Sequence, residues 1–260
     1  MSKRRVSDPV GPIALAIAAA ALLGGCDGDR GPTETARERT EAEAPGPTVA
    51  ARPDLSACPR AEPNELRIRT APIAVPAAFE GIAASSMDHL AFTALDGDTI
   101  CVDTTWLESV DGAELSKDGR FASFSWSGYE AFGHVIVDRS GNGQVIDTGN
   151  PPVRSPKGER IAAVDLSESG FGSLNAFAVW DISPSRLIER ARLERLPQLS
   201  DWRIDRWVGE RCLELSGVLF EDAPEDHRLI GEAPRQRYIA REVGSTWRVV
   251  PAPAGGCPRA

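Results

Sequence analysis

Hydrophobic and polar residues alternate in short runs along most of the chain beyond residue 65, and turn-forming residues separate these runs. A period of two is typical of half-buried strands, whereas helices repeat about every 3.6 residues. The runs that predict strands are 66–70, 90–94, 99–103, 121–127, 134–138, 144–148, 161–166, 176–182, 212–218, 236–243 and 246–250. The segment 186–193 fits either a helix or a strand, and Gly-containing hairpin turns are predicted at 141–143 and 243–246. The pattern therefore predicts an all-β fold.

Two of these stretches, 115–138 and 154–181, resemble each other. The matches are Ser116 with Ser155, Gly119 with Gly158, Phe121-Ala122 with Ile161-Ala162, Ser127-Gly128-Tyr129 with Ser169-Gly170-Phe171, and Asp138 with Asp181. The offset grows from 39 residues (116 to 155) to 43 residues (138 to 181). A period near 40 residues with several strands per unit is typical of a propeller blade.

The opening Ser-x-x-Gly-x-φ-Ala resembles the repeat of the Tol-system periplasmic β-propellers, and Trp180-Asp181 is similar to the Trp-Asp dipeptide of other propellers. The resemblance implies propeller-like repeats of about 40 residues. The chain beyond residue 57 has room for four or five such blades, and an incomplete ring is included in this expectation. A β-sandwich is the alternative. The resemblance carries no catalytic residues.

The N-terminal segment has the pattern of a signal peptide. Lys3, Arg4 and Arg5 precede the uncharged run 13–23, which is too short to span a bilayer as a helix. The run ends in Leu23-Gly24-Gly25-Cys26, which resembles the lipobox of bacterial lipoproteins. The resemblance implies cleavage before Cys26 and lipidation of Cys26. We therefore expect a protein anchored to a membrane of the bacterial cell envelope and facing the periplasm, and the sequence does not distinguish the inner from the outer membrane.

The chain divides into a signal peptide (1–25), a lipidated Cys26 with a Pro-, Ala- and Glu-rich tether (26–57), and a β-rich domain (58–260). The tether has too few large apolar residues to offset the entropy lost on ordering. The whole chain has a net charge of −9, and this acidic balance argues against a nucleic-acid partner.

The β-rich domain contains four cysteines, an even number that favours disulfides in an exported protein. Two pairings are plausible. Cys58–Cys101 with Cys212–Cys257 would join each end of the domain to a nearby strand, and this pairing is preferred. Cys58–Cys257 with Cys101–Cys212 would tie the termini together.

No motif for catalysis, a cofactor or a metal ion is present with sufficient specificity to be assigned. We therefore expect a non-enzymatic binding or scaffold module for an envelope protein, peptide or glycan. The alternatives are a periplasmic hydrolase with an unrecognised site and a structural lipoprotein without a specific ligand. The candidate binding residues lie in two matched loops: Tyr129, Glu130, His134, Glu168 and Phe171. Tyr129 and Phe171 could equally fold back and cap the core.

Overall fold

A computed structural model describes residues 52–60, 69–166, 174 and 176–258 of the chain. All of its sheets belong to one compact unit, Pro47–Ala260. The other unit, Met1–Gly46, contains the predicted signal peptide and Cys26 and lies outside the described residues. In the described part of the chain, no helix has the length and apolar character needed to cross a membrane.

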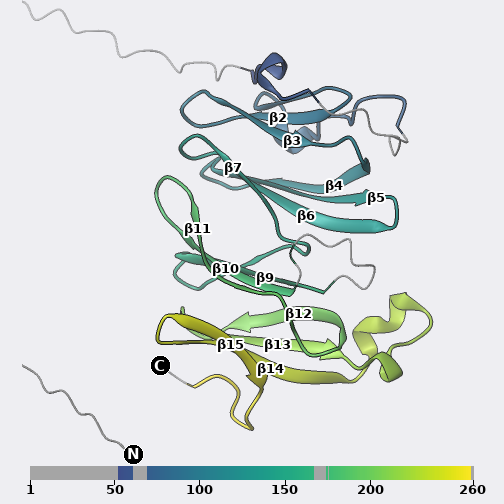
Figure 1. The fold of residues 1–260 in the computed structure, drawn as a ribbon, viewed down its shortest axis with the longest axis vertical. Helices are drawn as coiled ribbons and strands as arrows, with labels where there is room; N and C mark the ends of the chain where they lie inside the picture. Colours follow the sequence, from purple (N-terminus) through teal and green to yellow (C-terminus); the bar gives the residue numbers. More distant parts are fainter. Residues whose placement is uncertain (1–51, 61–68, 167–173, 175, 259–260) are drawn as a thin grey trace, which may run out of the picture. The chain divides into compact units, whose positions relative to one another are not determined.

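The fold is all-β, and the described residues form four antiparallel sheets of three or four strands (Figure 1). The first sheet contains β1 (Ala83–Ser85), β2 (His89–Thr93) and β3 (Thr99–Asp103). The second contains β4 (Leu107–Leu115), β5 (Phe121–Gly128), β6 (Ala131–Asp138) and β7 (Gln144–Asp147). The third contains β8 (Val153–Arg154), β9 (Arg160–Asp165), β10 (Ala176–Ile182) and β11 (Leu187–Leu193), and the fourth contains β12 (Ser200–Trp207), β13 (Cys212–Val218), β14 (Arg235–Val243) and β15 (Thr246–Pro251).

Short 3₁₀ helices lie before and between the strands: η1 (Leu55–Ala57), η2 (Ala77–Phe79), η3 (Phe220–Asp222) and η4 (His227–Glu232). The segment 186–193, which fitted either a helix or a strand, contains strand β11. Both predicted hairpin turns are present, between β6 and β7 and between β14 and β15.

Each sheet is a meander in which strands consecutive in the chain are neighbours. Hydrophobic clusters join the sheets in series. Phe92 and Phe124 belong to the cluster between the first and second sheets, Ile136 and Trp180 to that between the second and third, and Phe177 and Leu213 to that between the third and fourth. Among the described residues, no cluster joins the first sheet to the fourth, so the core does not close into a ring.

One backbone hydrogen bond recurs in all four sheets. In each sheet, an N–H group at or next to the end of one strand donates to the carbonyl group of the residue before the preceding strand. The donors and acceptors are Thr93 to Ile82 (2.9 Å), Arg139 to Arg120 (2.8 Å), Ile182 to Glu159 (2.8 Å) and Glu242 to Arg211 (2.9 Å). This equivalence aligns β1, β2 and β3 with β5, β6 and β7. The first sheet therefore has no counterpart of β4 in the described part of the chain.

The serine turns that suggested the repeat have the same hydrogen bonds in the second and third sheets. The Ser116 hydroxyl accepts from the N–H group of Phe121 at 2.8 Å, and the Ser155 hydroxyl accepts from that of Arg160 at 3.0 Å. Phe121 is therefore equivalent to Arg160, and the match of Phe121-Ala122 with Ile161-Ala162 was wrong by one residue. Apolar character misled the alignment, because an arginine stands where the second sheet has a phenylalanine.

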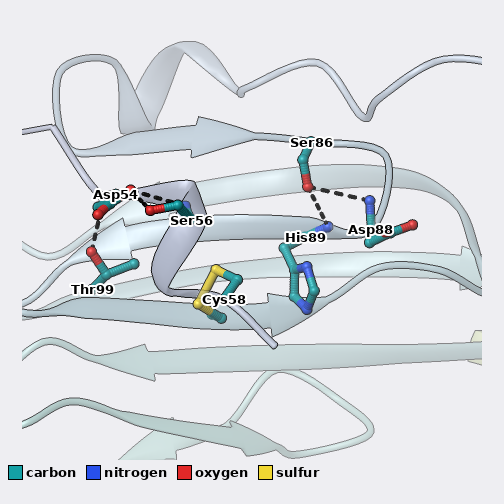
Figure 2. Close-up of a disulfide and its surroundings, with 8 residues drawn as sticks. Asp54, Ser56, Cys58, Ser86, Asp88, His89 and Thr99 are labelled. Carbon is teal, nitrogen blue, oxygen red and sulfur yellow. Dashed lines mark hydrogen bonds between the residues drawn. A yellow bond between two sulfur atoms is a disulfide. The ribbon is translucent and has the colours of Figure 1, made fainter. Parts of the chain in front are cut away.

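The structure contains the preferred disulfides, Cys58–Cys101 and Cys212–Cys257. Near the first of them, the fold begins earlier than the predicted boundary at residue 58. The Asp54 carboxylate caps η1 by accepting from the Ser56 N–H group at 2.9 Å, and the Asp54 N–H group donates to the Thr99 hydroxyl at 2.8 Å (Figure 2). Residues 54–57, which were assigned to the tether, are thus part of the domain.

Candidate functional site

The most exposed aromatic side chains of the described residues lie on the hairpin between β5 and β6. The strands end at the pair Gly128–Ala131, and Tyr129 and Glu130 form the two-residue turn. The Tyr129 side chain is 64% exposed and that of Phe132 is 76% exposed. Large aromatic side chains in water are unfavourable unless a partner covers them, so this pair marks a candidate interaction surface. We call Tyr129, Glu130 and Phe132 the aromatic hairpin.

Two tryptophans support the aromatic hairpin from inside. The rings of Trp106 and Trp126 meet edge to face with centroids 4.4 Å apart. Gly128 and Gly133 provide the space for them, because a Cβ atom on Gly128 would lie 2.8 Å from the Trp106 carbonyl oxygen and one on Gly133 would lie 2.4 Å from the Trp126 ring. The close packing fixes the base of the hairpin. An interface built on a fixed base loses little conformational entropy on binding.

Two exposed carboxylates lie beside the aromatic hairpin. Leu107 pairs with Gly128, which places the exposed Glu108 on β4 beside the turn. Glu130 is exposed in the turn itself, with a backbone φ of 53°. Neither 103–115 nor 121–138 contains a lysine or an arginine. The two aromatic rings therefore lie next to carboxylates that have no cation on their own strands.

The residues predicted to bind a partner differ in their positions in the structure. Tyr129 and Glu130 lie on the surface, so Tyr129 does not fold back to cap the core. The second loop, with Glu168 and Phe171, falls outside the described residues. His134 is not a surface residue: it lies within β6 and is 5% exposed, because the chain has already returned to the sheet at that point. His134 is therefore withdrawn from the predicted binding residues.

Sequence reasoning missed Phe132, Trp106 and Glu108. Phe132 pairs with the polar Ser127 and follows the buried Ala131, so the alternation along β6 does place it outward. The outward position of Phe132 can be inferred from this alternation only if the residue at which the turn ends is known, and the sequence did not define that residue. Glu108 belongs to β4, a strand that was not predicted, and its position beside the turn follows from strand pairing alone.

His134 and Ser125 could be considered as the base and the nucleophile of a hydrolase site, because the His134 Nδ1 atom lies 3.1 Å from the Ser125 hydroxyl. Burial lowers the pKa of His134 to about 4. A base with that pKa has little capacity to accept a proton from serine at neutral pH. Asp138 does not complete a triad, since Arg120 and Ser140 occupy its carboxylate. The Ser125–His134 contact is thus a cross-strand hydrogen bond within the sheet.

Replacing His134 with asparagine should remove an acid sensitivity of the fold. The buried imidazole is neutral, while the unfolded chain binds a proton below pH 6.5, so its contribution to stability is complete above pH 6.5 and falls as the pH drops toward 4. At pH 4.5 this loss is about 2–3 kcal/mol. Urea unfolding at pH 7.5 and pH 4.5 should show the wild type losing about that much more stability than His134→Asn.

Asp165 makes this comparison between variants necessary. Burial, and to a lesser extent Asp147, raises the pKa of Asp165 to about 6, so protonation of Asp165 favours the folded state as the pH falls through 6. This effect opposes that of His134 and is present in both proteins, so it cancels in the difference. Equal pH dependence in wild type and His134→Asn would contradict the assignment.

No group of three His, Cys, Asp or Glu side chains suited to a metal ion occurs within the described ranges. The Asp147–Asp165 pair packs against the backbone: a Cβ atom on Gly149 would lie 2.2 Å from the Asp165 carboxylate, and Asn150 donates to the carbonyl of neighbouring Val164 at 2.9 Å. These acids belong to the junction between the second and third sheets.

The sequence matches no protein-family model and no curated protein. The site is therefore interpreted from its own geometry.

Proposed function

We propose that the chain is a lipid-anchored protein of the bacterial cell envelope whose β domain is a non-enzymatic binding module. Its partner is a protein that presents an apolar surface with basic residues, and it docks on the aromatic hairpin. The observation that carries this proposal is the exposure of Tyr129 and Phe132 on a tightly packed turn. Aromatic side chains dominate the energetics of interfaces, and the adjacent carboxylates favour a basic partner.

The anchor and the location rest on the sequence and on the cysteines. The lipobox ending at Cys26 implies lipid attachment and a position facing the periplasm. The two disulfides of the domain are typical of proteins that fold in an oxidising compartment. In this proposal the tether carries the domain away from the membrane so that the hairpin is free to meet its partner.

We interpret the four sheets as consecutive blades of an open, propeller-like array. The recurrent hydrogen bond between the strands and the shared serine turns support this interpretation. In repeat folds, equivalent loops project from one face and often carry recognition. The β5–β6 turn would then belong to such a face, together with the equivalent β13–β14 connection.

The test is crosslinking in intact cells that express the full chain. Replacing both aromatic residues, in Tyr129→Ser/Phe132→Ser, should reduce capture of a discrete envelope protein roughly 10- to 100-fold, because each side chain acts as an anchor of the interface. The matched control is Leu95→Ser, which removes a 55% exposed apolar side chain from the β2–β3 hairpin. Thermal unfolding should be similar for all variants, since the replaced side chains lie outside the core.

Unchanged capture by the double variant would reject the aromatic hairpin as the docking site. Equal loss in Leu95→Ser would show that the interaction is nonspecific. A separate experiment tests the lipid anchor: in detergent phase partitioning, Cys26→Ser should move the protein from the detergent phase to the aqueous phase. Identical partitioning of Cys26→Ser and wild type would refute lipidation and leave the docking result standing.

A further inference from the structure

A second site lies at the junction of the third and fourth sheets, away from the aromatic hairpin. A cleft of about 570 Å³ opens between the turn before β9 and the turn before β13. Its lining includes Pro156, Lys157, Val208, Arg241, Val243 and Pro258. The volume falls within the range of small-molecule sites. We propose that this cleft binds a small amphipathic anion, with an apolar body and one carboxylate or phosphate group.

The apolar part of the cleft comes from four separate segments. Pro156 belongs to the serine turn of the third sheet, Val208 follows β12, and Val243 ends β14 with its side chain 45% exposed. Pro258 adds a fourth wall from the C-terminal segment. The disulfide Cys212–Cys257 holds that segment against β13, so the wall is covalently fixed. Such a preformed apolar surface binds an apolar group without first ordering a loop.

The carboxylates of the cleft are already engaged. Glu242 Oε2 lies 3.0 Å from Arg160 Nη1 and 3.0 Å from Arg211 Nε. Glu210 Oε1 accepts from the Lys157 N–H group at 2.9 Å, and its Oε2 atom is buried without a hydrogen-bond partner among the described residues. Glu242 is therefore paired with two arginines, and the unpaired oxygen of Glu210 is withdrawn from the surface. The acids instead hold the two turns together and fix the position of Lys157.

The cations of the rim are available. The Lys157 and Arg241 side chains are exposed, and among the described residues no carboxylate lies within ion-pair distance of either one. These two free cations stand beside an apolar surface in a chain of net charge −9. Arginine and lysine bind carboxylate and phosphate groups by charge-assisted hydrogen bonds. The combination favours an anion that also carries an apolar group. The apolar walls can bury that group, and the two cations of the rim can bind the negative charge.

The test uses three probes of equal chain length: octanoate, octyl phosphate and octyltrimethylammonium. They are titrated below their micelle-forming concentrations into the full chain carrying Cys26→Ser, and binding is measured by calorimetry. Amide chemical shifts of Gly209 and Val243 report the location. We expect at least one of the anions to bind, with shifts at both residues, and the cation not to bind. Lys157→Gln/Arg241→Gln should raise the dissociation constant at least tenfold.

The matched control is Lys117→Gln, which removes an exposed lysine from the equivalent serine turn of the second sheet and should bind like the parent. A preference for octanoate or octyl phosphate identifies which anionic group the rim recognises. The proposal is overturned if neither anion binds, if the cation binds equally well, or if Lys117→Gln weakens binding as much as the double variant. Thermal unfolding confirms that the variants are folded, and their substitutions are at exposed positions.

Discussion

Replacing Arg120 with methionine should lower the free energy of unfolding by about 3–5 kcal/mol, because the change leaves a buried carboxylate without its cation. Asp138 is fully buried at the end of β6. Arg120 donates to it from Nε to Oδ1 and from Nη2 to Oδ2, each at 2.8 Å. Ser140 adds hydrogen bonds from its N–H group at 3.0 Å and from its hydroxyl group at 2.7 Å.

The opposing effects of burial and hydrogen bonding on the Asp138 carboxylate explain the size of this loss in stability. Burial alone would raise the pKa of Asp138, but the hydrogen bonds from Arg120 and Ser140 outweigh burial and hold the pKa below its ordinary value. Without Arg120 only burial and Ser140 remain. Replacing both charged residues, in Arg120→Met/Asp138→Leu, should recover much of the loss, since no unpaired charge is then buried.

Chemical denaturation at pH 7 measures both variants. The matched control is Arg228→Met, which removes the 89% exposed partner of Asp226 and should change stability far less than Arg120→Met does, because water screens an exposed ion pair. A loss of similar size in Arg120→Met and Arg228→Met would contradict the argument. So would a double variant that is less stable than Arg120→Met alone.

Removing either disulfide should lower the free energy of unfolding by about 2–4 kcal/mol, through the entropy of the unfolded chain. The bridges span 43 residues between Cys58 and Cys101 and 45 residues between Cys212 and Cys257. Their loops are nearly equal, so the two serine double variants should lose similar amounts in denaturation experiments.

The two disulfide variants should differ in where the loss appears. Hydrogen exchange should accelerate mainly in the first sheet for Cys58→Ser/Cys101→Ser and mainly in the fourth for Cys212→Ser/Cys257→Ser, because the sheets pack in series. A variant with wild-type stability would refute the stabilising role of its bridge. Acceleration confined to the opposite end of the domain would refute the local assignment.

Strands that pack on both faces were predictable from the sequence, whereas the exposed edge strand β4 was not. In β2 every residue is buried, and in β10 five of seven residues are, so their apolar character stood out. In β4, by contrast, only Leu107 is buried, and the register shifts between Asp111 and Glu114. Its alternation is therefore broken, and the pairing with β5 defines it as a strand.

The candidate site was predicted in part for a similar reason. Tyr129 and Glu130 were found because a turn between two good strands is visible in the sequence. His134 was assigned to the same loop because the sequence does not show that β6 begins at Ala131. The cleft between the third and fourth sheets could not be predicted from the sequence, since it joins residues such as Lys157 and Arg241 that only tertiary packing brings together.

The serial packing of the sheets has a mechanical consequence when combined with the disulfide near the start of the domain. A chain pulled from its N-terminal end delivers the force to Cys58. The bond to Cys101 passes that force directly to β3, so the 43-residue loop between them cannot be drawn out. Tension on the tether would then act on the contact between the first and second sheets, where Phe79, Phe92 and Phe124 pack together. The first sheet would then separate from the second sheet without unfolding first, and the second, third and fourth sheets would keep their contacts with one another.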